Sequence, residues 1–117
     1  IHGKDINNIQ DDGFEINSQL EMFKIDRPDT CGEMVRSMAR VMSLLVDELE
    51  KVKPDIVLSG FDIGANLAVT MAAAHMNIPV AHIQGGEVSG SIDESIRHAV
   101  TKFSHIHFMV SLIPDLL

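Results

Sequence analysis

The chain has little of several residue types, and each shortage excludes a class of function. Its single cysteine, Cys31, cannot form an internal disulfide and is typical of a reducing compartment. Without tryptophan or tyrosine, and with five phenylalanines, it offers no aromatic platform for stacking nucleic-acid bases. Lysine and arginine total 9 against 17 acidic residues, a net charge of −8 with no basic stripe. We therefore expect no binding to nucleic acid or to anionic membranes.

Long hydrophobic runs are also missing. No apolar segment approaches the length of a membrane-spanning helix, and the first residues lack the basic start and apolar middle of a signal peptide. We therefore expect a cytoplasmic protein.

The patterns that are present predict one α/β domain, because 117 residues leave room for a single domain. Short β-branched runs predict strands at 55–59, 79–83 and 105–110, and helical segments follow at 65–76 and 92–103. This alternation predicts a Rossmann-like parallel sheet flanked by helices, with right-handed crossovers.

The first half of the chain has one strong helix signal. Thr30 and Glu33 have the spacing of a capping box, and apolar residues recur every three or four positions from 31 to 52. Ile6 and Ile9 predict the last turn of a short helix that ends at Asp11-Asp12-Gly13. Partial alternation of apolar residues at 14–25 predicts a short strand.

Chemistry-bearing residues gather after the strand at 79–83. That strand is predicted to stop at Gln84, and Gly85-Gly86 allows a sharp turn. Ser91 and Glu94 form a second capping box, which opens the helix at 92–103. Ligands bind outside the carboxyl ends of strands in open parallel sheets. The residues grouped at this edge are Gln84, Glu87, Asp93, Glu94, Arg97 and His98.

The strings GGEVSG, IDESIRHAVTK and HIHF resemble the UDP-N-acetylglucosamine 2-epimerase family, and specifically its hydrolysing branch. Weaker similarity extends back through KPDIVLSGFDIG to the GKDINNIQDDGFEI region. The resemblance implies a partial N-terminal domain at 1–117, about the first third of a two-domain GT-B-like enzyme. The first strand and the second, UDP-binding domain would be absent from this chain.

The resemblance also implies a reaction and its residues. Family members of this branch eliminate UDP from the sugar and add water to the resulting glycal, which releases N-acetylmannosamine for sialic and related acids. The implied catalytic residues are Asp62, Glu87 and Asp93. Those implied to bind substrate are Gln84, Gly85, Gly86, Glu94, Arg97 and His98. Phe61 and Ile63 replace the glycine and arginine of the family's Gly-Asp-Arg loop. Gln84 replaces a frequent glutamate.

Three of the candidates also have a purely structural interpretation. Asp62 is a natural helix N-cap, Glu94 completes a capping box, and Arg97 can pair with Asp93. Three further histidines lie in or beside strands, where we expect them to be buried and hydrogen-bonded: His82, His105 and His107. No third ligand accompanies the His105-x-His107 pair, so no metal site is predicted.

Other function classes are weaker. The glycines match neither a P-loop nor a dinucleotide fingerprint, so no NAD, ATP or other cofactor is expected. The first expected partner is a UDP-sugar substrate, either UDP-N-acetylglucosamine or a modified relative. We also expect further copies of the full-length protein to bind, as a homo-oligomer. Two alternatives stay open: a non-catalytic assembly module, and a non-hydrolysing epimerase that returns UDP-N-acetylmannosamine.

Overall fold

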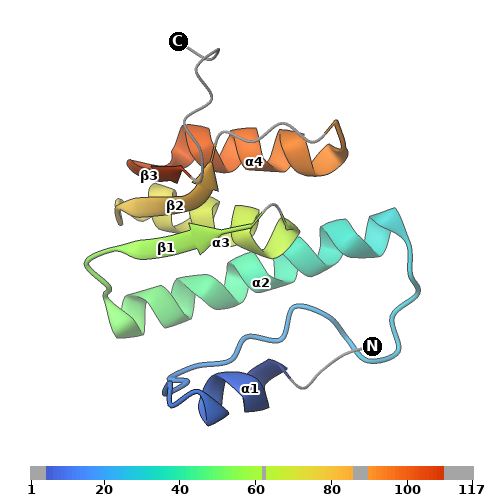
Figure 1. Ribbon diagram of the computed structural model, residues 1–117. Coiled ribbons are helices and arrows are strands. Elements are labelled where there is room, and N and C mark those ends of the chain that lie inside the picture. The colour runs from blue at the N-terminus through green and yellow to red at the C-terminus, as the bar shows by residue number, and fades with distance from the viewer. Residues whose placement is uncertain (1–4, 62, 86–89, 110–117) are drawn as a thin grey trace.

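The computed structural model describes residues 5–61, 63–85 and 90–109, which form four helices and a small sheet (Figure 1). The helices are α1 (Asp5–Asp11), α2 (Cys31–Val52), α3 (Gly64–His75) and α4 (Ile92–Phe103). The strands are β1 (Val57–Gly60), β2 (Val80–Gly85) and β3 (Ile106–Met109). Both long predicted helices, 31–52 and 92–103, are confirmed to the residue.

The three strands form a parallel sheet in the order β1-β2-β3, as the sequence predicts. Ser59 is opposite His82 in the register, and His82 is opposite His107. A bulge interrupts the β2–β3 pairing between Ile83 and Gly85. The bulge lies at the carboxyl end of β2, where the sequence places the candidate site.

Helices α3 and α4 cover the same face of this sheet (Figure 1). The hydroxyl of Thr70 in α3 donates a hydrogen bond to the Ser59 hydroxyl in β1, at 2.8 Å. The hydroxyl of Thr101 in α4 is 3.1 Å from Nδ1 of His82 in β2. Because Ser59 and His82 are register partners on neighbouring strands, both helices must lie on one side.

Helix α2 packs against α3 and builds the hydrophobic core. Its buried stripe is Val41, Leu45 and Leu49, which contacts a row of alanines in α3 and Val80 of β2. The alanines have small side chains, so α2 can approach α3 closely. The apolar stripe of α2 therefore serves mainly as packing surface.

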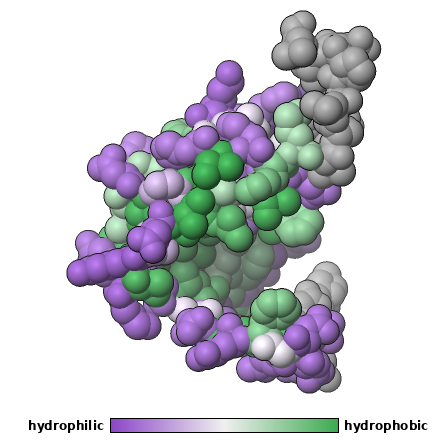
Figure 2. Space-filling view, turned by 60° about the vertical axis from the view of Figure 1, so that its left-hand side comes forward, coloured by the Kyte–Doolittle hydropathy of each residue, from purple (hydrophilic) through white to green (hydrophobic). Residues whose placement is uncertain are grey.

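The opposite face of the sheet is exposed within the described part of the chain. Two rows of register partners cross it, and Leu58 and Phe108 on these rows are 64% and 54% exposed. Figure 2 shows apolar side chains gathered across the middle of the visible surface, with hydrophilic ones at its margins. A parallel sheet is usually covered on both faces, and here the described helices cover one of them.

The predicted strand at 14–25 is wrong. Residues 14–25 have no strand structure, and the apolar alternation instead anchors the segment to α2. Leu20 and Met22 pack against the core, and Arg40 donates to the Met22 carbonyl at 2.6 Å. The segment has apolar residues in the right spacing, but it pairs with neither edge strand of the sheet, β1 or β3.

The capping boxes are half right. Thr30 accepts from the Glu33 N–H at 3.2 Å, as predicted, but the Glu33 carboxylate pairs with Arg40 at 3.1 Å. Ser91 caps α4 by accepting from the Asp93 N–H, and the Glu94 carboxylate accepts from the N–H of Gly90 at 2.6 Å. In both helices the hydroxyl cap is correct and the glutamate has a different partner from the expected one.

Candidate active site

The predicted site is at the carboxyl ends of the strands, beyond which two helices project. Helix α2 runs back toward β1 through a short connection, and its Met38 would be 3.0 Å from a Cβ added at Gly64, just after β1. In α4, Thr101 contacts β2, and Asp93 lies eight residues earlier, or about 12 Å along the helix axis. The N-terminal turns of α2 and α4 therefore both extend past this edge (Figure 1).

Three of the predicted site residues, Asp62, Gly86 and Glu87, lie outside the described residues. Their roles stay predictions. The others are described, and they fall into two groups. One group is at the end of β2 and the other is on the first turns of α4.

Gln84 occupies an unusual backbone conformation at the end of β2. The sequence predicts that the strand stops at this residue, but β2 continues to Gly85 through the bulge. Gln84 has φ +67°, in the left-handed region that non-glycine residues seldom occupy. The half-buried glutamine thus takes the strained position, and the neighbouring glycine does not. Strain of this kind, without a helix-capping role, is a feature of functional sites.

Gly85 is buried because a histidine packs against its backbone. A Cβ at position 85 would be 3.1 Å from Nδ1 of His82 and 3.6 Å from the Thr101 hydroxyl. A side chain there would require the imidazole to shift by a few tenths of an ångström. The glycine therefore favours close packing under the site, in addition to any contact with substrate.

His82 is the largest fully buried side chain of the structure, at 1% exposure. Its Nδ1 is hydrogen-bonded to Thr101, and its buried Nε2 has no hydrogen-bond partner in the described part of the chain. Burial lowers the pKa of His82 below its ordinary value, and the nearby His107 and Arg97 lower it further. The imidazole is thus held neutral beneath the end of β2.

The first turn of α4 presents its acidic residues differently. Asp93 is exposed, and its carboxylate accepts a hydrogen bond from the Ser91 hydroxyl at 3.0 Å. Glu94 is half-buried and has a structural partner in Gly90. Asp93 is therefore the more accessible of the two carboxylates, and its catalytic role stays a prediction.

Arg97 and His98 follow one turn later. Arg97 is 7% exposed and is close enough to His82 to depress its pKa. His98 is exposed, with Nε2 3.6 Å from the Glu94 carboxylate, a contact that becomes an ion pair only when the histidine is protonated. Arg97 is thus a buried cation next to the β2 end, and His98 faces solvent.

The loop after β1 has the second strained residue of this edge. Phe61 is 68% exposed with φ +68°. The N-cap of α3 is Ile63, which makes no side-chain cap, and Asp62, the expected N-cap, lies outside the described residues. Beneath the loop, the buried Ser59 hydroxyl accepts a hydrogen bond from the Thr70 hydroxyl and donates one to the Asn66 carbonyl. This polar cluster holds the β1 end against α3.

The strand histidines are only partly as predicted. His82 is buried and hydrogen-bonded, but His105 and His107 are exposed because β3 is an edge strand. The Nδ1 atom of His105 still accepts from the Val80 N–H at 3.2 Å. Within residues 5–61, 63–85 and 90–109, no group of three histidine, cysteine or acidic residues is arranged to hold a metal ion. No helix in these ranges is long and apolar enough to cross a membrane.

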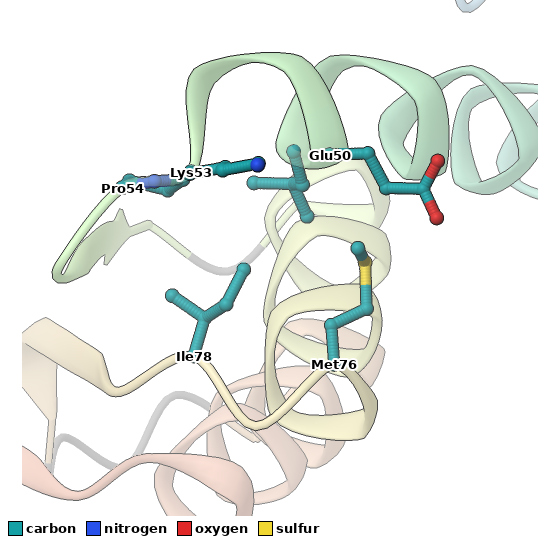
Figure 3. A pocket seen from close by; sticks show the side chains of 6 residues that line it. Glu50, Lys53, Pro54, Met76 and Ile78 are labelled. Atoms are coloured by element: carbon teal, nitrogen blue, oxygen red, sulfur yellow. The ribbon is translucent and has the colours of Figure 1, made fainter.

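The larger of two described pockets lies at the opposite, amino-terminal edge of the sheet (Figure 3). Its volume is about 580 Å³, and its walls include Leu49, Glu50, Lys53, Met76 and Ile78. The side chains of Met76 and Ile78 rise toward the last turn of α2, and the Glu50 carboxylate points away. Its walls bring no set of polar groups together, so volume alone does not make this pocket the candidate site.

The sequence pattern of the UDP-N-acetylglucosamine 2-epimerase family matches residues 2–112. The chain belongs to this family. A UDP-N,N'-diacetylbacillosamine 2-epimerase (hydrolyzing) of Legionella pneumophila is 35% identical over 111 residues, which are 95% of this chain and 29% of that protein. A GDP/UDP-N,N'-diacetylbacillosamine 2-epimerase (hydrolyzing) of Campylobacter jejuni is 40% identical over 77 residues, 65% of this chain and 20% of its own length.

A solved structure shows the same fold. The UDP-GlcNAc 2-epimerase of Neisseria meningitidis, crystallised with UDP-GlcNAc, superposes with a TM-score of 0.77 at 24% identity. The alignment covers 91% of this chain and 29% of that one. This confirms the predicted Rossmann-like, GT-B-like fold class. The chain thus spans less than a third of these relatives.

Sequence reasoning missed the link between the two groups of site residues. His82 and Thr101 are 19 positions apart, and their contact joins the end of β2 to α4. A histidine within an apolar strand and a threonine late in the next helix were the available signals. Neither signal predicts the pairing without the register of the sheet.

Proposed function

We propose that the protein to which this chain belongs is a hydrolysing UDP-sugar 2-epimerase. Its substrate is UDP-N-acetylglucosamine or a modified, N-acetylated relative, and its products are UDP and the free C2-inverted sugar. The hydrolysing enzymes among the relatives support this branch. The substrate of the Neisseria structure supports the nucleotide sugar.

The reaction divides into two steps. A base removes the C2 proton while the C1–O bond to UDP breaks, which leaves a C1–C2 double bond. Water then adds its oxygen to C1, and a proton returns to C2 from the opposite face. Carboxylates suit the proton transfers, and we assign them to Asp62, Glu87 and Asp93.

Gln84, Gly85, Gly86, Glu94, Arg97 and His98 are proposed to bind the substrate. A glutamine can hydrogen-bond a sugar but cannot act as a base, so Gln84 is a binding residue. The observation that carries the proposal is the strained Gln84, at the bulged end of β2 that precedes the acidic first turn of α4. Assembly with further copies and a cytoplasmic location are part of the same proposal.

A product assay tests this proposal. The purified protein would be compared with a chimera in which residues 2–112 replace the matching segment of the Legionella relative. The chimera supplies the remainder of a full-length protein. We expect it to release UDP and free N-acetylmannosamine from UDP-N-acetylglucosamine, or the corresponding free sugar from the diacetylbacillosamine nucleotide.

The products also separate the alternatives. UDP-N-acetylmannosamine in place of the free sugar would identify a non-hydrolysing epimerase. A folded chimera that turns over neither nucleotide sugar would favour a non-catalytic assembly module. The unchanged Legionella protein, assayed in parallel, is the control for the rest of the chimera.

A further inference from the structure

A second described pocket lies at the N-terminal end of α2, on the side of the molecule that carries the candidate site. It has a volume of about 440 Å³ and lies between the loop at 24–28 and the first turns of α2. Its charged lining residues are Lys24, Asp26, Arg27, Glu33, Arg36 and Arg40. Four cations thus face two carboxylates, in a chain whose net charge is −8. The local excess of positive charge is opposite in sign to the whole molecule.

Part of this cluster is occupied by internal contacts. Arg40 donates to the Met22 carbonyl at 2.6 Å and to the Glu33 carboxylate at 3.1 Å. The other Glu33 oxygen is 3.7 Å from Arg36. Arg40 and the buried Glu33 therefore hold the loop to α2, and Glu33 is already shared by two guanidinium groups.

Arg27 has donor capacity that these contacts leave unused. Its Nη1 is buried and has no hydrogen-bond acceptor among the described residues. The exposed Asp29 carboxylate forms an ion pair with it at 3.8 Å, which is beyond hydrogen-bond range. The guanidinium stacks over the Phe23 ring, 4.0 Å from its centroid. The ring fixes the orientation of the guanidinium, so less side-chain entropy is lost when an anion binds.

Arg36 and Lys24 complete the open side of the pocket. The Arg36 side chain is 71% exposed, and its only described ion pair is the 3.7 Å contact with Glu33. Lys24 is exposed. Both can turn toward a bound anion without breaking a contact in the core.

We propose that this pocket binds a small phosphate-bearing anion. A guanidinium presents paired N–H donors that match the oxygens of a phosphate group, and two arginines with one lysine can neutralise its charge. A volume of about 440 Å³ suits a small phosphorylated metabolite and is too small for a macromolecule. The inference goes beyond the proposed epimerase activity and does not depend on turnover.

Titration with inorganic phosphate, followed by ¹H–¹⁵N NMR of the purified protein at constant ionic strength, tests the proposal. We expect saturable shifts confined to residues 22–40, including the arginine side-chain N–H groups. Arg27→Gln and, separately, Arg36→Gln are expected to weaken binding about tenfold each, the scale of one lost charge-assisted bond. Arg27→Lys keeps the positive charge but loses the paired N–H donors of the guanidinium. Its affinity for phosphate should lie between those of wild type and Arg27→Gln.

Lys51→Gln is the matched control. It removes one positive charge at the far end of α2, where Lys51 is 3.5 Å from Glu48, and should leave the titration unchanged. Shifts that never saturate, or equal affinities for wild type and both glutamine variants, would overturn the proposal. Because Arg36 is highly exposed, its variant keeps the test valid even if Arg27→Gln perturbs the loop.

Separate titrations with UDP and uridine identify the source of the phosphate group. Shifts of residues 22–40 with UDP but not with uridine would support a site that also accepts the phosphates of a nucleotide. Shifts with inorganic phosphate alone would support a site for a smaller anion. No shift of these residues with either phosphate compound would contradict the site.

Discussion

The two edges of the sheet contain the same kind of backbone distortion for different reasons. At the amino-terminal edge, the residues with positive φ are Lys53 at 49° and Asn77 at 58°. Both end helices. Lys53 caps α2 through its N–H to the Leu49 carbonyl, and Asn77 belongs to a Schellman motif in which the Ile78 N–H reaches the Ala73 carbonyl.

At the carboxyl-terminal edge, Phe61 and Gln84 have φ of 68° and 67°, and neither ends a helix. Phe61 follows β1 and Gln84 interrupts β2, and each lies beside a predicted catalytic loop. The difference shows how positive φ should be interpreted. At one edge it is the ordinary geometry of helix termination, and at the other it has no such local cause and coincides with the candidate site.

The largest expected effect concerns the carboxylates of the two edges. Glu87→Gln and Asp93→Asn remove a proton-transfer group, and each should reduce the turnover of the chimera at least a hundredfold. Glu50→Gln changes a carboxylate at the amino-terminal pocket and should leave turnover unchanged. Turnover measured by UDP release checks all three variants. Near-normal rates in both site variants would remove the functional contrast between the edges.

A smaller effect concerns the backbone. Gln84→Gly relieves a left-handed non-glycine residue and should raise the free energy of unfolding by up to about 1 kcal/mol, while it lowers kcat/KM. Asn77→Gly should change stability by only about a few tenths of a kcal/mol, since asparagine already tolerates this conformation. Urea unfolding provides the measurement. A loss of stability in Gln84→Gly would mean that side-chain contacts outweigh backbone strain at this edge.

The smallest effect is a pH dependence of stability. His82 has a lowered pKa in the folded state, so below pH 6.5 the unfolded chain binds more protons than the folded one. Its contribution to stability is complete above pH 6.5 and is lost as pH falls through the lowered folded-state pKa. Urea unfolding should show a lower free energy of unfolding at pH 5.5 than at pH 7.5. This difference should be smaller in the His82→Gln variant.

The exposed His75, at the end of α3, is the control for this pH experiment. The His75→Gln variant should lose as much free energy of unfolding between pH 7.5 and 5.5 as the wild-type protein does. An equal drop in the His82→Gln variant would assign the pH dependence to other groups.

Local signals predicted the parts of this fold that depend on local physics. The bounds of α2 and α4 follow from the hydroxyl caps Thr30 and Ser91, and both hydroxyls cap as expected. The strand expected at 14–25 is absent because Leu20 and Met22 pack against the core instead, a long-range contact that apolar alternation does not specify. The bulge at Gln84 and the buried contact of His82 with Thr101 depend on register between distant segments, which no local pattern specifies.

The candidate site was predictable to the extent that its residues share one edge of a parallel sheet. Topology alone brings Gln84, Gly85 and the start of α4 to that edge. The assignment of proton-transfer roles to Asp62, Glu87 and Asp93 stays a prediction, because roles depend on distances to a substrate.

Solvent deuterium shows whether this edge of the sheet cleaves the C2–H bond of the sugar. Proton NMR would follow the chimera with UDP-N-acetylglucosamine in deuterated water, while UDP is quantified in the same sample. We predict free N-acetylmannosamine with deuterium at C2 and one UDP per sugar. Free N-acetylglucosamine that retains its C2 proton would show simple hydrolysis at C1. That result would contradict C2–H cleavage at this edge.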